Sequence, residues 1–483
     1  MTCNRREFLK SAGLSGLGLA GGAGAGWASG RKAVEDDDLP RRLREYGRNR
    51  RQEFNMSGFR APQIPMVRVG IIGLGQRGPS HMSTLAGIEG VDIKALCDLR
   101  PEKTEEAKRK LFGTGHSPDL YAGSPESWKE LCRRDDLDLV IITTPWSMHA
   151  GMAAYAMEHG RHVATEVPAA GTLEECWQLV ETAERTRRHL MMMENYAYMD
   201  FQLLTLNMAR RGFFGEVVHC EGAYNTSKMA NNFSKSLYWD MWWLKQYAHR
   251  KGNIYPTHGL GPVCQVLDIN RGDRLDFLVS VESDDFMMGA RARELADTDG
   301  FFKPFAGRDF RGNMNVTTLR TKRGRTVMLQ HDATSPSPHN LIHRITGTRG
   351  AALYDPPPPR LSVGNHEWTT PAEFEKLKDE YTPEFTRRMA EISRTSGHGG
   401  SDIRLCWRLI DCLHNGLPLD QDVYDAAAWS SIVPLSEWSV RHRSQSIDIP
   451  DFTAGAWETN ARNMDLNLES GGNTRVAPLG PTP

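Results

Sequence analysis

A short glycine-rich segment constrains the fold of this chain more than any other feature. Val67–Ile72 is a β-rich apolar run, Gly73-x-Gly75-x-x-Gly78 follows it, and a possible helix begins at Pro79. In such a motif the first glycine makes a tight turn and the second lets the backbone approach a pyrophosphate. The third lets the helix pack close to the strand, and the helix N-terminus faces the phosphate charge. The segment therefore predicts a dinucleotide-binding Rossmann unit.

The residues after the glycine motif support its interpretation as a dinucleotide-binding site. The next apolar run, Ile93–Cys97, ends at Asp98, about twenty residues past the glycines, where an acidic residue receives the ribose hydroxyls. A carboxylate there repels a 2′-phosphate, which favours NAD over NADP. The alternative is that Asp98 only caps a helix before Pro101, and we prefer the ribose-binding interpretation.

Strands and helices alternate through the rest of this half. Strands are expected at Leu139–Thr143, His162–Thr165 and His189–Met193, and helices at Ser147–Glu158 and from Thr172 to about Arg188. The second helix opens with a capping box, Thr172-Leu-Glu-Glu175. This alternation predicts an α/β domain with a doubly wound parallel sheet over residues 66–193.

The pattern changes after residue 193. A helix is expected at Phe201–Arg211, and strand-like runs follow without regular helices between them. The runs are Glu216–Tyr224, Leu275–Glu282, Thr326–His331 and Leu341–Thr346, followed by helices at Ser401–Asn415 and Tyr424–Arg441 and a polar, loop-like tail after about Gly455. Residues 194–483 are thus expected to form an α+β domain with a largely antiparallel open sheet that supplies the substrate pocket.

The first 30 residues resemble a twin-arginine signal peptide. The chain reads Asn4-Arg5-Arg6-Glu7-Phe8-Leu9-Lys10, and a weakly apolar run rich in glycine continues to about Ala28. An amphipathic start or a membrane anchor is the alternative, but the run is too short and glycine-rich for a stable anchor. We expect export to the periplasm or beyond, by a route that carries folded proteins, with NAD loaded beforehand. Residues 31–65, which are charged and lack an apolar period, are expected to form a linker or a surface arm.

Charge and cysteine usage exclude some other functions. The formal net charge is −1 and no basic stripe is present, which gives no reason to expect a nucleic-acid partner. None of the eight cysteines forms a Cys-x-x-Cys pair, so we expect no metal site. Removal of Cys3 with the signal would leave an odd number, which weakens a disulfide framework but leaves one bridge open.

Two further motifs resemble the glucose-fructose oxidoreductase and inositol dehydrogenase superfamily. They are Thr144-Pro-Trp-Ser-Met-His149 and Glu166-Val167-Pro168. Typical members carry Glu-Lys-Pro at the second motif, where the lysine assists hydride transfer, and an Asp-x-Gly-x-His helix later on. Here Val167 replaces the lysine, and Pro256 and Leu260 stand at the aspartate and histidine positions.

Over roughly residues 67–457 the chain more closely resembles glycoside hydrolase family 109, the NAD-dependent α-N-acetylgalactosaminidases. The resemblance rests on several motifs in the same order: Leu173-Glu-Glu-Cys-Trp177, Glu194-Asn195, Tyr255-Pro-Thr-His-Gly-Leu-Gly-Pro262, Asp268-Ile-Asn-Arg-Gly272, Gly397-His-Gly-Gly400 and Trp429-Ser-Ser-Ile-Val-Pro-Leu-Ser-Glu437. It implies a glycosidase in which NAD⁺ takes hydride from C3 of the sugar and the C2 proton leaves. The glycosidic oxygen is then eliminated, water adds at C1 and the hydride returns. The cofactor would never need to dissociate.

The resemblance also implies which residues form the site. The cofactor contacts, besides the three glycines, would be Gln76, Arg77, Asp98, Trp146, Ser147, Met148, His149, Glu166, Val167 and Asn195. The sugar site would be lined by Tyr224, Trp243, Tyr255, Pro256, Thr257, His258 and His339. Trp243 and His339 stand where the family has an arginine and a tyrosine that contact substrate, and Asn225–Trp239 is divergent, so the sugar can differ from N-acetylgalactosamine.

Two side chains are candidates for acid/base chemistry. We expect His258 to act as a base or proton shuttle at the oxidised carbon, since imidazole exchanges protons near neutral pH. Tyr198 is a second candidate. The alternatives are that His258 only packs before Gly259 and that Tyr198 and Tyr224 only fill a domain interface. His398 is left out of the catalytic set.

Two other functions stay open. The chain could be a net sugar oxidoreductase of the same superfamily, against which Val167 argues, or a non-catalytic sugar-binding protein that keeps NAD as a structural ligand. The partners expected are therefore a glycoside or sugar and, through the open face of the C-terminal sheet, a second copy of the chain.

Overall fold

The computed structural model describes residues 37–364, 366–393 and 398–476. The predicted signal peptide, the first residues of the predicted arm and Gly397 lie outside the described residues. In the described ranges, no helix combines the length and the apolar character needed to cross a bilayer.

The N-terminal half folds into the doubly wound parallel sheet that the sequence predicts. Its strands lie in the order β3-β2-β1-β4-β5-β6, and every neighbouring pair is parallel. The central strands are buried because helices cover both faces of such a sheet. The strand order reverses between β1 and β4, which opens a crevice at their carboxyl ends. The strands are β1 (Val67–Ile72), β2 (Val91–Asp98), β3 (Asp119–Ala122), β4 (Leu139–Ile142), β5 (His162–Thr165) and β6 (Leu190–Met192).

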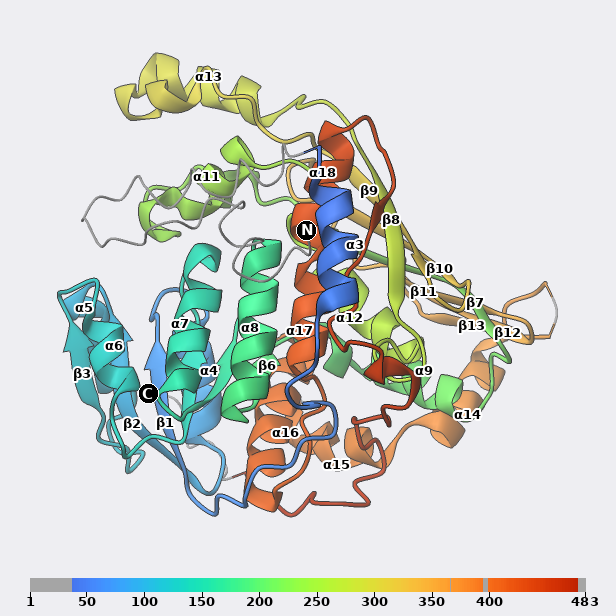
Figure 1. Cartoon of the computed structure of the whole chain (residues 1–483), viewed down its shortest axis with the longest axis horizontal. Coiled ribbons are helices and arrows are strands. Elements are labelled where there is room, and N and C mark those ends of the chain that lie inside the picture. The colour runs from blue at the N-terminus through green and yellow to red at the C-terminus, as the bar shows by residue number, and fades with distance from the viewer. Residues whose placement is uncertain (1–36, 365, 394–397, 477–483) are drawn as a thin grey trace.

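Helices on this sheet begin where local chemistry favours a start. The predicted capping box is present, since the Thr172 hydroxyl accepts from the Glu175 N–H at 3.2 Å and the Glu175 carboxylate accepts from the Thr172 N–H. Figure 1 shows α7 and α8 side by side over the sheet. The helices are α4 (Gly78–Ala86), α5 (Pro101–Lys110), α6 (Ser127–Cys132), α7 (Trp146–Glu158) and α8 (Leu173–Thr186).

The C-terminal half is built on an open sheet of eight described strands, which lies to the right in Figure 1. Its order is β13-β12-β11-β7-β10-β9-β8-β14, and all pairs are antiparallel except β10 with β7. The largely antiparallel sheet confirms the predicted fold class. The strands are β7 (Val217–Asn225), β8 (Leu275–Glu282), β9 (Asn315–Thr321), β10 (Thr326–Asp332), β11 (His343–Gly347), β12 (Gly350–Tyr354), β13 (Arg360–Val363) and β14 (Ile447–Asp448).

Helices cover one face of this sheet. α12 (Thr257–Val266) packs on β7, and α18 (Ile432–Arg441) packs on β8. α11 (Trp242–His249) and α13 (Met288–Thr298) project together above α7 in Figure 1. The remaining α-helices described after β6 are α9 (Asp200–Arg210), α10 (Met229–Asn232), α14 (Pro371–Tyr381), α15 (Glu384–Ser393), α16 (Ser401–Asn415) and α17 (Val423–Ser430).

The expectation that residues 31–65 lack an apolar period is wrong for one helix, α3 (Leu39–Asn49). Leu39, Leu43 and Tyr46 recur at helical spacing and are all buried. The Tyr46 ring lies 5.0 Å from that of Trp177 on α8. The many arginines of the segment hide this short stripe in the sequence.

The single helix expected at 424–441 is interrupted, because α17 ends at Ser430 and α18 begins at Ile432. Pro434, in the first turn of α18, cannot donate the hydrogen bond that would continue α17. β9 does not follow from the apolar pattern of the sequence, because its alternating buried and exposed residues are mostly threonine, asparagine and arginine.

Seven of the cysteines, from Cys97 to Cys412, lie in the described part of the chain. All seven are buried and none is bridged. Burial raises the pKa of thiols such as Cys132 and Cys220, each to about 12, so these side chains behave as small apolar groups. The disulfide left open by the sequence is therefore absent among these residues.

Candidate active site

The glycine loop has the shape that a bound dinucleotide needs. Gly73 has φ 92°, and a Cβ there would lie 2.8 Å from the Thr143 carbonyl carbon. A Cβ on Gly78 would lie 2.0 Å from the Gly73 oxygen, whereas one on Gly75 would meet nothing within 4 Å. The two outer glycines thus permit close backbone packing, and the middle one leaves open space at the N-terminus of α4 for a pyrophosphate.

Asp98 ends β2 beside this loop. Its carboxylate accepts from the Leu74 N–H at 2.8 Å and pairs with the Arg100 guanidinium at 3.2 Å. The side chain is buried, lines the cavity described next and keeps acceptor positions for ribose hydroxyls. The loop and the Asp98 carboxylate therefore fit NAD, in agreement with the ribose-binding role predicted for Asp98.

A cavity of about 830 Å³ runs from the glycine loop to the C-terminal domain. It unites most of the predicted site residues. Those that line it are Gly73, Gly75, Gln76, Arg77, Asp98, Trp146, Met148, His149, Glu166, Val167, Asn195, Tyr224, Trp243, Tyr255 and His258. The volume suits one nucleotide cofactor with a small substrate.

Arg77 connects the cofactor loop to both halves of the molecule. Its guanidinium pairs with Glu166 at the end of β5 at 2.8 Å and with Asp402 on α16 at 2.9 Å. The Asn195 amide also donates to Asp402, at 2.8 Å. Burial alone would raise the pKa of Glu166, but the Arg77 charge and a hydrogen bond from His81 hold it well below its usual range. Arg77, Glu166, Asp402 and Asn195 therefore form a polar frame beside the cavity.

His149 is an anchor rather than an open contact. Its ring nitrogens lie 2.8 Å from the Pro168 oxygen and 2.7 Å from the Thr144 oxygen. Complete burial lowers the pKa of His149, while hydrogen bonds to the two carbonyl oxygens oppose this shift, and the ring holds the two loops together at the cavity edge.

His258, on the first turn of α12, forms a dyad with Glu194 that the sequence analysis missed. The His258 Nδ1 lies 2.8 and 2.9 Å from the two Glu194 oxygens. Glu194 is fully buried and also accepts from the Tyr196 N–H at 2.9 Å. With Nδ1 occupied, the Nε2 atom has no partner among the described residues, and the ring lines the cavity. A carboxylate that orients an imidazole in this way prepares Nε2 to accept a proton.

Tyrosines surround the exposed side of this imidazole. Ring centroids of Tyr196, Tyr255 and Tyr224 lie 4.2, 4.9 and 5.2 Å from that of His258. Burial raises the pKa of all three phenols, which keeps them protonated as hydrogen-bond donors. Trp146 stacks on Tyr255 at 5.3 Å and extends this aromatic surface toward the cofactor loop.

The structure places Tyr198, the second acid/base candidate, away from the cavity. Its ring is completely buried outside the cavity, and its hydroxyl donates to Asp420 at 3.2 Å. Asn195–Tyr198 form a 3₁₀ turn, in which residues two apart point to different sides. Tyr196 faces the cavity instead, and the sequence offered no period by which to choose between them.

Five other predicted contacts do not line the cavity: Gly78, Ser147, Pro256, Thr257 and His339. Gly78 acts through backbone packing, and Pro256 and Thr257 begin α12 and so orient His258. Ser147 and His339 are exposed, although the His339 ring lies 5.9 Å from Tyr224 at the rim. These residues support or border the site without forming its wall.

The divergent segment 225–239 closes the cavity from above. Lys228, Ser236, Leu237, Tyr238 and Trp239 all line it, although the sequence analysis assigned none of them a contact. The Gln76 amide donates to the Leu237 carbonyl at 3.1 Å, which ties the segment to the cofactor loop. Divergence from a family pattern was the only sequence signal for this wall.

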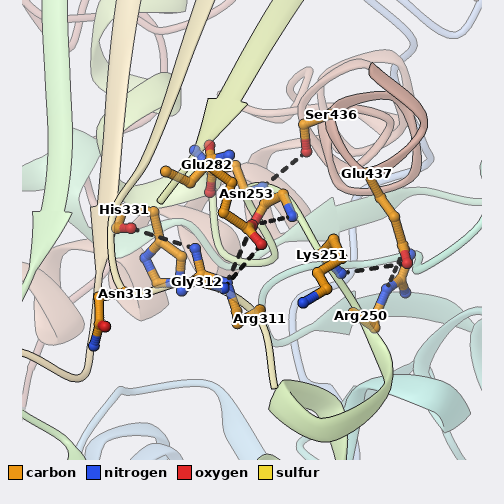
Figure 2. A network of polar contacts seen from close by, with 12 residues as sticks. Arg250, Lys251, Asn253, Glu282, Arg311, Gly312, Asn313, His331, Ser436 and Glu437 are labelled. Carbon is orange, nitrogen blue, oxygen red and sulfur yellow. Dashed lines mark hydrogen bonds and ion pairs between the residues drawn. The ribbon is translucent and has the colours of Figure 1, made fainter. Parts of the chain in front are cut away.

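A buried polar network holds the loop that carries Tyr255 and His258 (Figure 2). Arg311, which is fully buried, donates to the Gly252 carbonyl at 3.2 Å and the His331 carbonyl at 3.4 Å and lies 3.8 Å from Glu282. Glu282 accepts from the Gly252 and Gly312 N–H groups, and burial raises its pKa. This arrangement fixes the backbone at Gly252.

The same loop is also held from α18. The Asn253 N–H donates to the Ser436 hydroxyl at 2.9 Å, and Arg250 pairs with Glu437 at 3.0 Å (Figure 2). The residues just before Tyr255 are therefore fixed on two sides, which leaves His258 little freedom relative to the cavity.

Comparison with known families identifies relatives of both halves. Residues 198–459 match the family model described as glycosyl hydrolase 109, C-terminal domain, and residues 67–194 match the oxidoreductase family, NAD-binding Rossmann fold. An α-N-acetylgalactosaminidase of Bacteroides fragilis is 45% identical over 413 residues, covering 84% of this chain and 96% of the relative. One of Shewanella oneidensis is 40% identical over 467 residues, covering 94% and 97%.

Solved structures with the same fold are more distant in sequence. A levoglucosan dehydrogenase in complex with NADH superposes with a TM-score of 0.59 at 17% identity, covering 80% of this chain and 99% of the other. An oxidoreductase domain protein from Kribbella flavida gives 0.61 at 16%, covering 80% and 100%. These structures share the two-domain fold.

Proposed function

Since this chain belongs to glycosyl hydrolase family 109, a glycosidase family, and has an NAD-binding Rossmann domain, we propose that it is an exported α-N-acetylgalactosaminidase-like glycoside hydrolase that keeps NAD bound through each turnover. One observation carries the proposal. The Glu194–His258 dyad presents a free Nε2 atom to the same cavity that the glycine loop and Asp98 line. An acid/base group and a cofactor site thus line the same cavity, where both could act on one sugar.

The residues that would hold the cofactor are those of the cavity's Rossmann side. Gly73 and Gly75 would leave room for the pyrophosphate, Asp98 would accept hydrogen bonds from the ribose hydroxyls, and Trp146 and Val167 line the cavity beyond them. When bound, NAD⁺ supplies a hydride acceptor for C3 of the sugar and returns the hydride at the end.

The side chains of the C-terminal domain would move the protons. Oxidation at C3 acidifies the C2 hydrogen, and the His258 Nε2 atom removes it while Glu194 stabilises the imidazolium. The glycosidic oxygen leaves as a C1–C2 double bond forms, and water then adds at C1 as the proton returns to C2. The Tyr196, Tyr224 and Tyr255 phenols, kept neutral by burial, donate hydrogen bonds to sugar oxygens and exclude bulk water.

An isotope experiment tests this proposal. The protein is purified without added NAD, assayed for bound cofactor and given aryl α- and β-glycosides in deuterated water. We expect release of the aryl group, deuterium at C2 and no lasting NADH. His258→Ala should abolish the exchange while bound NAD remains. Accumulation of NADH without cleavage would show a net oxidoreductase, and bound NAD without turnover of any sugar would show a binding protein.

Two further proposals concern the setting of the enzyme. Arg5-Arg6 and the run after them support export by the twin-arginine route to the periplasm or beyond. Val281 on β8 is exposed on the face of the C-terminal sheet opposite to the one that buries Leu278, which supports a homodimer through that face. Sedimentation of the purified protein would test the dimer.

A further inference from the structure

One cation in the cavity has no negative partner. Four lysines and arginines line it: Arg77, Arg100, Lys103 and Lys228. The first two pair with carboxylates of the cavity, and Lys103 pairs with Glu106 at 2.8 Å. Across the described ranges, the Lys228 ammonium forms no ion pair. Among the described residues that line the cavity, the positive charge of Lys228 therefore has no negative partner.

The carboxylates that line the cavity do not neutralise Lys228, because each of them already pairs with another basic side chain. Asp98 pairs with Arg100, Glu126 with Lys129, and Glu166 with Arg77 and His81. Lys228 is half-buried, and burial lowers its pKa. An ammonium held partly out of water without a counterion costs free energy that an anionic ligand would recover.

Lys228 belongs to the substrate side of the cavity. It follows β7, whose Tyr224 faces His258, and its N–H donates to the Ala333 carbonyl at 3.0 Å. The neighbouring Met229 packs against the aromatic cluster of Trp146 and Trp243. The adenosine side, formed around Asp98, comes from the Rossmann strands instead.

The aromatic wall beside Lys228 suits a sugar ring. Tyr238 stacks on Trp243 at 5.4 Å, and Trp242 and Trp239 continue this surface, with Trp239 46% exposed. Aromatic faces pack against the C–H faces of sugars, while a lysine at their edge recognises charge. The divergent segment thus brings a stacking surface and a free cation together.

We propose that Lys228 forms an anion subsite, so that the preferred glycoside carries a carboxylate or sulfate, as in a uronide or a sulfated amino sugar. This inference rests on the proposed function for the reaction itself and concerns only the substrate. A charge-assisted hydrogen bond to Lys228 would favour the anionic substrate about tenfold to hundredfold over its neutral counterpart.

The test compares substrates that differ in one charge. The intact protein is given 4-nitrophenyl α-galactoside and α-galacturonide, and 4-nitrophenyl N-acetyl-α-galactosaminide with and without a 6-sulfate. Binding of free galacturonic acid and galactose is followed separately by tryptophan fluorescence. We expect a preference for an anionic member of at least tenfold, its loss in Lys228→Met and its retention in Lys228→Arg. Lys245→Met is the matched control, since Lys245 pairs with Asp240 outside the cavity.

Three results would overturn the inference: no preference for either anionic substrate, a preference that survives Lys228→Met, or loss of bound NAD in that variant. The last would assign the lysine to a cofactor phosphate. Cleavage without charge preference would leave the proposed function intact and refute the subsite. Binding of galacturonic acid that depends on Lys228, without cleavage of any glycoside, would support the subsite and refute the proposed function.

Discussion

At the scale of single residues, the chemistry depends on which nitrogen of His258 is free. Glu194 binds the Nδ1 atom, which leaves Nε2 for the cavity. The two residues lie 64 positions apart in the sequence, so only folding brings them together. These contacts offset the desolvation of the buried Glu194 carboxylate, because His258 and the Tyr196 N–H both form hydrogen bonds with it.

The carboxylate should matter nearly as much as the imidazole. We predict that Glu194→Gln lowers kcat by about a hundredfold or more, because the amide keeps the geometry but not the charge that stabilises imidazolium. Deuterium incorporation at C2 should fall in parallel, while the amount of NAD bound after purification stays unchanged. Wild-type turnover in this variant would show that Glu194 only supports the fold.

Two neighbouring tyrosines should respond in opposite ways. Tyr196→Phe should lower kcat/KM about tenfold with little change in stability, because its hydroxyl is available to the cavity. Tyr198→Phe should leave kcat/KM near wild type and lower the free energy of unfolding by about 1–2 kcal/mol, because Asp420 loses a buried donor. Steady-state kinetics and urea unfolding of both variants measure this, and a kinetic defect in Tyr198→Phe alone would reverse the assignment.

At the scale of elements, the loop before α12 is held by charge buried beneath it. Glu282 ends β8 and Arg311 precedes β9, and both bond the backbone at Gly252 (Figure 2). The position of Tyr255 and His258 is therefore set by residues that never touch a sugar.

Removal of the buried guanidinium should affect stability and rate together. Arg311→Met removes the larger of the two positive charges that act on Glu282, which should lower the free energy of unfolding by about 3 kcal/mol and reduce kcat. Lys251→Met is the control in the same network, because Lys251 pairs with the exposed Asp309 and should cost less than about 1 kcal/mol. Denaturant unfolding and kcat measurements test both, and equal effects of the two substitutions would contradict the special role of Arg311.

The sequence predicts elements best where period and turn chemistry agree. The five strands expected between Val67 and Met193 and the capping box at Thr172 follow from apolar runs and local hydrogen bonding, and all are present, whereas the short, partly exposed β3 was not expected. α3 was missed because charge masks a narrow apolar stripe, and β9 because a strand buried on one face can be built from threonines.

At the scale of the whole molecule, stability should depend on pH through buried histidines. Burial lowers the pKa of His162 and of His343 to about 4. The unfolded chain binds protons near pH 6.5 where the folded chain does not, so stability is full above pH 6.5 and falls as pH drops toward 4. The loss should be at most about 3 kcal/mol for each histidine.

Urea unfolding between pH 7 and pH 4 measures this dependence. His343→Gln should flatten the pH profile over that range, since glutamine keeps polarity without titrating. A profile identical to that of the wild type would show that His343 does not titrate in this way.

Export should require the two arginines at the N-terminus. Replacing Arg5 and Arg6 with lysines should leave the protein in the cytoplasm with NAD bound, because the signal fails while the folded domain does not change. Fractionation of a host with the twin-arginine route would measure this, and undiminished export of the lysine variant would refute the proposed route.

Site residues, like the elements of the fold, could be predicted from the sequence where the signal is local. Gly73, Gly75 and Asp98 were predictable because they are local to a strand and a turn, and His258 because it sits in a motif. Glu194, Tyr196 and Lys228 were not, since their roles depend on contacts between distant segments or on which side of a 3₁₀ turn a ring faces.

The bridge from Arg77 to Asp402 also sets an order of events during synthesis. The two residues are separated by 325 positions, so the cofactor frame stays incomplete while the ribosome is still making the second half. A nascent chain with a finished Rossmann sheet still lacks Asp402 and the wall around His258. Capture of the cofactor in its full frame therefore waits until α16 has left the ribosome, and we expect a chain truncated before α16 to be made without bound cofactor.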